Sequence, residues 1–277
     1  MTEEIVPNYK FSRASYVLSL LRPQIFTDLE LKKHGLKVHL RDPSSYTPIR
    51  PDLQSSGGPT SLTLGMCGKM NHQQISQFSE KDAAKYVEYE EELEQFVKAV
   101  DPLLDHAAVD VQALSEASIF EKIKILKSNM HLLKSAKVLG PTANSFYELM
   151  TAPTTKILDK WFESEPLKAT LATDSCIGAM ISPETPGSGY VLLHHVMGEL
   201  EGIRGAWGYP EGGMGAVSGA IAKSAHASGA QIFTSSPVAK ITTAISGEAN
   251  GIVLENGTEV KAKIVLSNAT PEITFNR

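Results

Sequence analysis

The sequence predicts a fold that mixes helix and strand, of the α/β and α+β classes together. Apolar residues recur at helical spacing between residues 79 and 200, whereas β-branched and apolar runs of strand length lie at 36–40, at 61–64 and beyond residue 230. Glycine and proline separate most of these segments, and a chain of 277 residues can bury a large core. We therefore expect a helical middle flanked by segments that contain strands.

The first part of the chain is rich in turns and contains two short predicted strands. Residues 36–40 and 61–64 have the apolar and β-branched composition of strands. Residues 42–59 between them are rich in Pro, Ser and Gly, which is typical of an exposed loop. The two strands can pair across that loop as a wide hairpin.

The middle of the chain is predicted to be helical. Ser79 followed by Asp82 resembles a capping box, and the helix that it begins has one apolar face: Ala83, Tyr86, Leu93, Val97 and Val100. A second long helix ends at Gly140 and repeats the pattern with Phe120, Ile123, Leu126, Met130 and Leu133. Shorter helices are predicted around 143–151, 154–163, 167–177 and 189–200. An acidic run in the first helix is interpreted as a solvated face: Glu88, Glu90, Glu91, Glu92 and Glu94.

The last part of the chain changes to a helix followed by strands. The helix ends at Gly229 and has an apolar face made of Met214, Val217, Ile221 and Ala225. Strands are predicted at 232–234, 238–245 and 252–254, and Asn256-Gly257 is a strong hairpin signal because both residues tolerate a positive φ. Residues 260–262 should pair back, and 264–266 should form a buried apolar strand.

Composition excludes several classes of function. The net charge is −5 and no basic patch is present, which argues against a nucleic-acid-binding protein. No apolar run is long enough for a membrane-spanning helix. Cys67 and Cys176 lie far apart and outside any paired motif, so we expect inert thiols and no disulfide framework, zinc site or redox dithiol.

A glycine-rich segment, residues 205–215, is the most informative local feature. Gly213, Gly215 and Gly219 do not have the spacing of a dinucleotide fingerprint, and no strand leads into them. Small residues at the start of the following helix instead allow it to approach a sheet or a cofactor closely: Gly213, Gly215, Ala216, Gly219, Ala220 and Ala222. The amides at the helix start could face an electron-rich group, but plain packing without a ligand stays open.

Other candidate side chains have structural interpretations. Adjacent residues on a helix point about 100° apart, so His194 and His195 are expected to be core or surface side chains and not a metal pair. Ser188 lacks the spacing of a nucleophile elbow, and a role as a helix cap explains it better. Because no constellation supplies a nucleophile, a base or a metal, any redox chemistry must come from a bound cofactor.

Five segments toward the carboxyl end form an ordered series: WGYPEGGM at 207–214, GAQI at 229–232, VAKI at 238–241, GIVLENG at 251–257 and VLSNATP at 265–271. Together they resemble the phytoene desaturase-like branch of the FAD-dependent amine oxidase superfamily. FSRASY at 11–16, WFESEPLKATLATD at 161–174 and PGSGYVLLHHVMG at 186–198 resemble one member of that branch. The resemblance therefore covers nearly the whole chain.

The resemblance implies a partial FAD-binding Rossmann-like domain and a largely helical substrate domain. Residues 1–35 would follow the first FAD-binding unit, 36–205 would form most of the substrate domain, and 206–277 would return to the FAD-binding domain. With FAD as cofactor, the backbone of Val238 would meet the adenine edge, and Gly212 and Gly213 would pack beside the flavin. Asn268 and Ala269 would lie at a strand end near the cofactor.

The same resemblance implies an oxidoreductase whose flavin accepts a hydride from a C–C or C–N bond of an apolar or amine substrate. Tyr190, Leu192 and Val196 are the expected substrate-lining residues, and no catalytic residue is assigned. A flavoprotein-derived scaffold that acts through protein contacts is the alternative, and redox-neutral isomerisation on a reduced flavin is a third possibility.

The resemblance also bears on location and completeness. The related member implies the mitochondrial matrix, a mitochondrial protein partner and a role in regulating mitochondrial function, although the acidic amino terminus is unlike a presequence. The family's G-x-G-x-x-G unit, its acidic ribose ligand and its carboxy-terminal glycine-rich segment are not found in the sequence. We therefore expect this chain to be a fragment or splice product of a longer protein.

Overall fold

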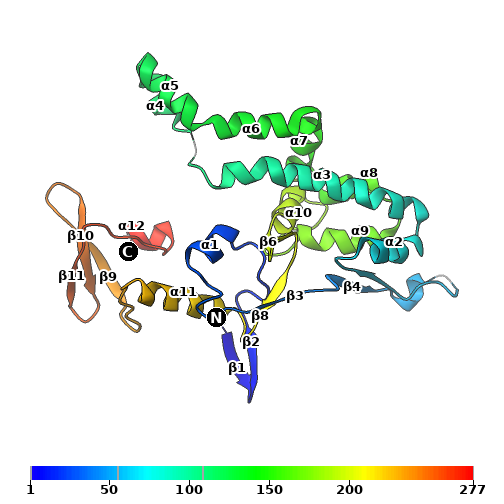
Figure 1. Ribbon diagram of the computed structural model, residues 1–277, viewed down its shortest axis with the longest axis horizontal. Helices are drawn as coiled ribbons and strands as arrows, with labels where there is room; N and C mark the ends of the chain where they lie inside the picture. Colours follow the sequence, from blue (N-terminus) through cyan, green and yellow to red (C-terminus); the bar gives the residue numbers. More distant parts are fainter. Residues whose placement is uncertain (1, 55, 108, 277) are drawn as a thin grey trace. The chain divides into compact units, whose positions relative to one another are not determined.

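The computed structural model describes residues 2–54, 56–107 and 109–276. It divides into two compact units, Met1–Ile221 and Ala222–Arg277, and each combines helices with small antiparallel sheets (Figure 1). The predicted mixture of helix and strand is therefore confirmed. Among the described residues, no helix is both long and apolar enough to cross a bilayer.

Strands of the first unit pair in four separate two-stranded sheets. They are β1 (Thr2–Val6) with β2 (Tyr9–Ser12), β3 (Val38–Leu40) with β8 (Gly208–Pro210), β4 (Ser45–Pro48) with β5 (Ser61–Leu64), and β6 (Glu199–Leu200) with β7 (Ile203–Arg204). The predicted wide hairpin is wrong. An unpredicted strand, β4, lies in the expected loop and pairs with β5, so β3 is left to pair with β8 from the glycine-rich segment.

Helices make up most of the first unit. In chain order they are α1 (Pro23–Asp28), α2 (Gly68–Ser76), α3 (Glu80–Leu104), α4 (Val111–Glu116), α5 (Ile119–Ser128), α6 (Met130–Leu139), α7 (Ala143–Thr151), α8 (Thr154–Trp161), α9 (Glu165–Ala172), α10 (Ser188–Val196) and the first part of α11 (Gly215–Ala227), whose later residues belong to the second unit. Short 3₁₀ turns lie at Pro51–Leu53, Gly140–Thr142 and Thr173–Ser175. The last of these turns ends the helix predicted over 167–177, and β6 replaces the end of the helix predicted over 189–200.

Helix α3 begins as predicted, but the Asp82 carboxylate does not cap its amino terminus. The Oγ of Ser79 accepts a hydrogen bond from the Asp82 amide at 3.1 Å. The buried Asp82 carboxylate accepts hydrogen bonds from the amides of Glu163 and Ser164, at 2.9 and 2.8 Å, and from the Ser164 hydroxyl. It therefore fixes the start of α9 to α3, and the reciprocal half of the capping box does not form.

The second long helix predicted from the sequence is two helices. Asn129 separates α5 from α6, and its side-chain amide donates to the Ile125 carbonyl at 2.8 Å. All five apolar residues of the predicted stripe are exposed: Phe120, Ile123, Leu126, Met130 and Leu133. The spacing predicted a helix correctly but did not predict whether another element covers it.

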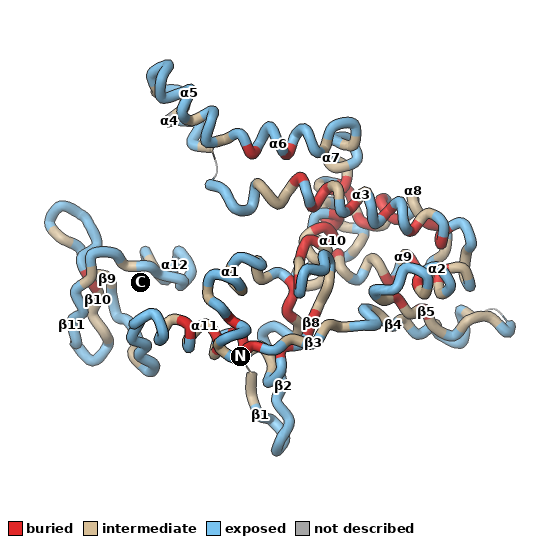
Figure 2. Tube along the Cα trace, viewed as in Figure 1, coloured by how far each residue is buried: buried red, intermediate tan, exposed pale blue. Residues whose placement is uncertain are grey.

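Two hydrophobic cores hold the first unit. The larger core joins α3 to α7, α8, α9 and α10, and Figure 2 shows it as the buried stretch along these helices. Its fully buried side chains include Phe96, Leu158, Leu167, Leu192 and Leu193, and each such side chain contributes about 1.5–3 kcal/mol. The smaller core comprises Leu18, Leu31, Leu36, Leu200, Val217 and Ala220, and it packs the start of α11 against the first 40 residues.

The second unit contains one three-stranded antiparallel sheet, in the order β11 (Glu259–Lys261), β10 (Ala249–Leu254), β9 (Val238–Thr243), and a short helix, α12 (Pro271–Asn276). The predicted hairpin between β10 and β11 is confirmed. Gly257 has φ +83°, and the Thr258 amide donates to the Asn256 Oδ1 at 3.0 Å.

Two strands predicted for this unit do not form. Residues 232–234 are irregular, and 264–266 are irregular too, with Ile264 and Leu266 exposed. The prediction of a buried strand at 264–266 is wrong: none of the unit's described strands pairs with this run, so its backbone groups have no partner strand.

Candidate functional site

The glycine-rich segment is held tightly in the first unit. Gly208 exchanges two backbone hydrogen bonds with Leu18, at 2.8 and 2.9 Å. A Cβ on Gly208 would lie 2.5 Å from a Leu200 methyl and 2.7 Å from a Val38 methyl. Only glycine fits this position, so the segment has a fixed path beside β3.

The turn that follows brings α11 against the β1–β2 hairpin. Gly212 and Gly213 have φ +85° and +78°, the left-handed region that glycine adopts without strain. The Met214 amide donates to the Ser12 hydroxyl at 2.8 Å, and the Gly215 amide donates to the Thr2 hydroxyl at 2.7 Å. Free amides at this helix start are therefore capped by two hydroxyl oxygens from the hairpin.

The expected close approach at these glycines is present, and its partner is protein. A Cβ on Gly213 would lie 2.8 Å from Ser12 Oγ, and one on Gly215 would lie 3.1 Å from Thr2 Oγ1. A Cβ on Gly219 would meet no atom within 4 Å, so its small size is not required by a neighbour. The interpretation of this stretch as plain packing accounts for Gly213 and Gly215.

Aromatic and charged side chains surround Trp207, just before this turn. The ring of Tyr16 meets the indole edge-to-face at 6.5 Å, and the guanidinium of Arg41 lies over the indole at 5.7 Å. The imidazole of His195 lies 6.3 Å from the indole ring, and the Trp207 Nε1–H donates to the His195 carbonyl at 3.3 Å. This Trp207 cluster joins the residue before β8 to α10 and to residues far apart in the sequence.

The titratable groups of the cluster have defined environments. His195 donates its Nδ1–H to the Val191 carbonyl at 2.8 Å, so the neutral ring has its lone pair on Nε2. Burial raises the pKa of the Asp174 carboxyl, although His195 and Arg41 act in the opposite direction. Burial also lowers the pKa of His194, whose ring stands perpendicular to that of His195. A proton acceptor thus lies beside the indole, and the desolvated Asp174 carboxyl interacts electrostatically with His195 and Arg41 of the cluster.

Sequence analysis missed this cluster because its members come from five segments. The sequence predicted only a core or surface position for His195, and it predicted no role for Tyr16, Asp174 or Trp207 beyond membership of the resembling segments. No local pattern connects Tyr16, Arg41 and Asp174, so a signal would have had to come from tertiary pairing.

Three other candidates have structural roles. The buried Ser188 hydroxyl accepts from the Thr154 amide at 2.8 Å and donates to the Pro183 carbonyl at 3.0 Å, so it caps α8 and not its own helix. Cys67 is exposed at the start of α2, Cys176 is half-buried, and both are free thiols. Of the expected substrate-lining residues, Leu192 lies in the larger core, Val196 packs against that core and Tyr190 is 47% exposed.

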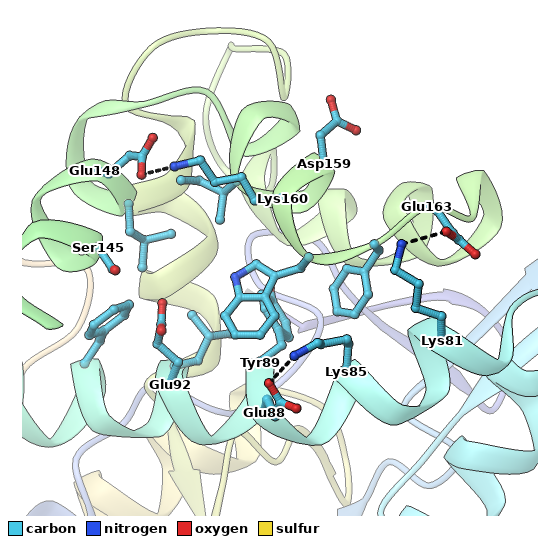
Figure 3. A pocket seen from close by; sticks show the side chains of 16 residues that line it. Lys81, Lys85, Glu88, Tyr89, Glu92, Ser145, Glu148, Asp159, Lys160 and Glu163 are labelled. Atoms are coloured by element: carbon cyan, nitrogen blue, oxygen red, sulfur yellow. Dashed lines mark hydrogen bonds and ion pairs between the residues drawn. The ribbon is translucent and has the colours of Figure 1, made fainter.

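A groove of about 450 Å³ lies between α3, α7 and α8 (Figure 3). Tyr89 and Trp161 line it in an edge-to-face pair at 5.8 Å. Ion pairs of Lys81 with Glu163, Lys85 with Glu88 and Lys160 with Glu148 border it. Glu92 also lines the groove, and burial raises the pKa of its carboxyl, so the acidic run is not uniformly solvated as predicted.

The remaining sequence-predicted site residues lie in the second unit. Val238 begins β9, an edge strand, and is 52% exposed. Asn268 and Ala269 are exposed in the loop before α12, where the Ala269 amide donates to the Ser267 hydroxyl at 3.3 Å. Gly212 and Gly213 belong to the first unit, so the five predicted cofactor-binding residues are divided between the two units.

Comparison with known proteins gives the chain its relatives. No protein-family model matches it. It is 58% identical over 275 residues to pyridine nucleotide-disulfide oxidoreductase domain-containing protein 2 of Rattus norvegicus, and 56% identical to the Mus musculus protein of the same name. These residues are 99% of this chain and 47% of each relative, so the chain spans about half the length of the curated relatives it matches.

A more distant relative agrees with the resemblance found in the sequence. Phytoene desaturase of Fusarium fujikuroi is 34% identical over 119 residues, which are 42% of this chain and 20% of that protein. Over nearly its whole length, this chain is therefore homologous to about half of pyridine nucleotide-disulfide oxidoreductase domain-containing protein 2.

Proposed function

We propose that this chain supplies the substrate domain and part of the FAD-binding domain of an FAD-dependent oxidoreductase. The observation that carries the proposal is the homology over 275 residues to a protein named for an oxidoreductase domain, joined by the phytoene desaturase match. In this proposal residues 1–35 and 206–277 belong to the FAD-binding domain and 36–205 to the substrate domain. The chain is then a fragment or splice product of a longer flavoprotein.

The residues of this chain fit the adenine end of FAD better than its flavin end. The edge strand β9 fits backbone recognition of an adenine, because the side of an edge strand away from its neighbour leaves N–H and C=O groups unpaired. Val238 is the proposed contact, and Asn268 and Ala269 are exposed enough to meet a ligand. Gly212 and Gly213 form the turn proposed to lie beside the flavin, and the amides that follow it are capped by protein hydroxyls.

The Trp207 cluster suits the reacting end of an apolar or amine substrate. When bound, flavin supplies the hydride acceptor. The Nε2 of His195 would accept the proton that leaves the substrate with the hydride, and the indole would offer the substrate an apolar surface. The name of the relatives includes a disulfide, but the two cysteines of this chain are free thiols and receive no redox role.

A chimera tests the proposal. This chain would replace the matching 275-residue region of the rat relative, and anaerobic addition of amines and of apolar alkanes or alkenes would be followed by flavin absorbance. We expect bleaching by at least one substrate class. Exchange of His195 for Gln should keep FAD bound and slow the bleaching at least a hundredfold, about the lower end of what a general base contributes. Persistent oxidised flavin with every substrate would favour the scaffold alternative, and bleaching that reverses without net oxidation would favour isomerisation.

Two substitutions test the adenine contact. Val238→Pro removes an amide donor and should strip FAD from the chimera, whereas Val238→Ala keeps the backbone and should retain it. Equal loss in both variants would contradict a backbone contact. We further propose a mitochondrial matrix location, with a mitochondrial protein partner and a role in regulating mitochondrial function, which imaging of the tagged chain and co-purification from mitochondria would test.

A further inference from the structure

Helix α5 has an apolar face that no other described element covers. Ile119, Ile123 and Leu126 lie on one side at helical spacing and are 75%, 48% and 62% exposed. Phe120 borders this side and is 84% exposed. The main neighbours of α5 are α4 and α6, which adjoin it in the chain, and Figure 2 shows its surface as exposed along nearly its whole length.

This helix is specified locally and does not depend on packing for its ends. The Ser118 hydroxyl accepts from the Glu121 amide, and the Glu121 carboxylate accepts from the Ser118 amide at 2.8 Å, which completes a capping box. The Ser118 hydroxyl also donates to the Glu121 carboxylate at 2.7 Å, and this hydrogen bond, together with that from the Ser118 amide, lowers the pKa of the Glu121 carboxyl. The apolar face therefore persists on a formed helix and is not a product of local unfolding.

Lysines surround the apolar face. At about 100° per residue, Lys122 flanks it on one side and Lys127 on the other, and Lys124 lies beyond Phe120. Lys134 and Lys137 add two charges on α6, where Met130 and Leu133 are also exposed. Glu121 is the only acid between residues 119 and 139, and no described carboxylate forms an ion pair with any of the five lysines.

We propose that α5, together with the exposed side of α6, docks on the surface of an anionic phospholipid membrane. The apolar side chains enter the boundary between headgroups and acyl chains, and the lysines bind anionic headgroups while their stems cover apolar surface. The lysine charges argue against a second copy of the chain as the partner of this face, because self-association would bring two sets of unpaired lysines together. The proposal does not depend on the flavin proposal.

Vesicle sedimentation tests this docking with the whole 277-residue chain. We expect binding to phosphatidylcholine vesicles that contain phosphatidylglycerol, weaker binding to pure phosphatidylcholine, and loss of binding as salt is raised. Phe120→Asp combined with Ile123→Asp should weaken binding at least tenfold. Lys122→Gln combined with Lys127→Gln should weaken it about 25-fold, from roughly fivefold for each lysine near the surface.

Matched substitutions elsewhere distinguish docking through α5 and α6 from nonspecific binding to vesicles. Phe275 in α12 is 83% exposed and Lys240 is exposed, so Phe275→Asp combined with Lys240→Gln should leave vesicle binding unchanged. All these positions are exposed, so circular dichroism should show unchanged helix content. Equal binding to neutral and anionic vesicles, or equal loss in the control, would overturn the proposal. So would a dimer in vesicle-free solution that Phe120→Asp dissociates, because that result would make this face a self-interface.

Discussion

Replacement of Gly213 by Ala should disrupt the packing of α11 against the amino-terminal hairpin β1–β2. An Ala at φ +78° costs about 1–2 kcal/mol of backbone strain. Its Cβ would stand 2.8 Å from both Ser12 Oγ and Thr2 Cγ2, so the hairpin must move. That movement weakens the hydrogen bonds of the Met214 and Gly215 amides, each of which contributes about 1 kcal/mol. The total is a loss of about 2–4 kcal/mol.

Urea denaturation measures this loss, and a glycine within α11 serves as control. A Cβ on Gly219 meets nothing within 4 Å, so Gly219→Ala should be neutral or should stabilise the chain by up to about 1 kcal/mol. Gly213→Val should be worse than Gly213→Ala, because a β-branched side chain overpacks the same site. If Gly213→Ala and Gly219→Ala have the same free energy of unfolding, the turn is an open loop and the argument fails.

Three further predictions concern the rest of the chain. Asp82→Ala leaves the Glu163 and Ser164 amides without their acceptor and should lower the free energy of unfolding by about 3–4 kcal/mol. Asp159→Ala, which removes an exposed ion pair, should lower it by less than about 1 kcal/mol. Similar losses in both variants would refute the role of Asp82 as the cap of α9. Burial lowers the pKa of His194 in the folded chain below its usual 6.5, so just below that pH the unfolded chain binds more protons than the folded chain. The His194 contribution to the free energy of unfolding should therefore fall as the pH drops below 6.5 and stay constant above it. His194→Gln should remove that part of the slope, and an unchanged slope would be evidence against burial as the cause. Cys67→Ser with Cys176→Ala should keep the chimera's turnover within a few-fold, and a hundredfold loss with FAD retained would restore thiol chemistry.

Local signals predicted local structure well. The Ser79 hydroxyl caps α3, and Asn256-Gly257 makes the hairpin, because both effects act within a few residues. Pairing between β3 and β8 joins residues about 170 positions apart, a distance that no local pattern bridges. The same reason explains why the wide hairpin was expected and did not form.

Prediction of the candidate site was limited in the same way, because its residues come from distant parts of the chain. The glycine run was recognised, since its composition is unusual, but its partners Thr2 and Ser12 carry no signal of their own. The apolar run at 264–266 predicted a buried strand, whereas Ile264 and Leu266 are exposed, and the apolar face of α5 is exposed as well. Periodicity reports which face is apolar, and only tertiary structure decides what covers it.

The visible absorption spectrum of the chimera, as purified, tests the account's central claim most directly. If this chain supplies part of an FAD-binding domain, the chimera should be yellow and should release stoichiometric FAD on denaturation, as the rat relative should. A colourless chimera beside a yellow relative would show that this chain's residues do not sustain the site. If both proteins are folded and colourless, the flavin assignment itself is contradicted.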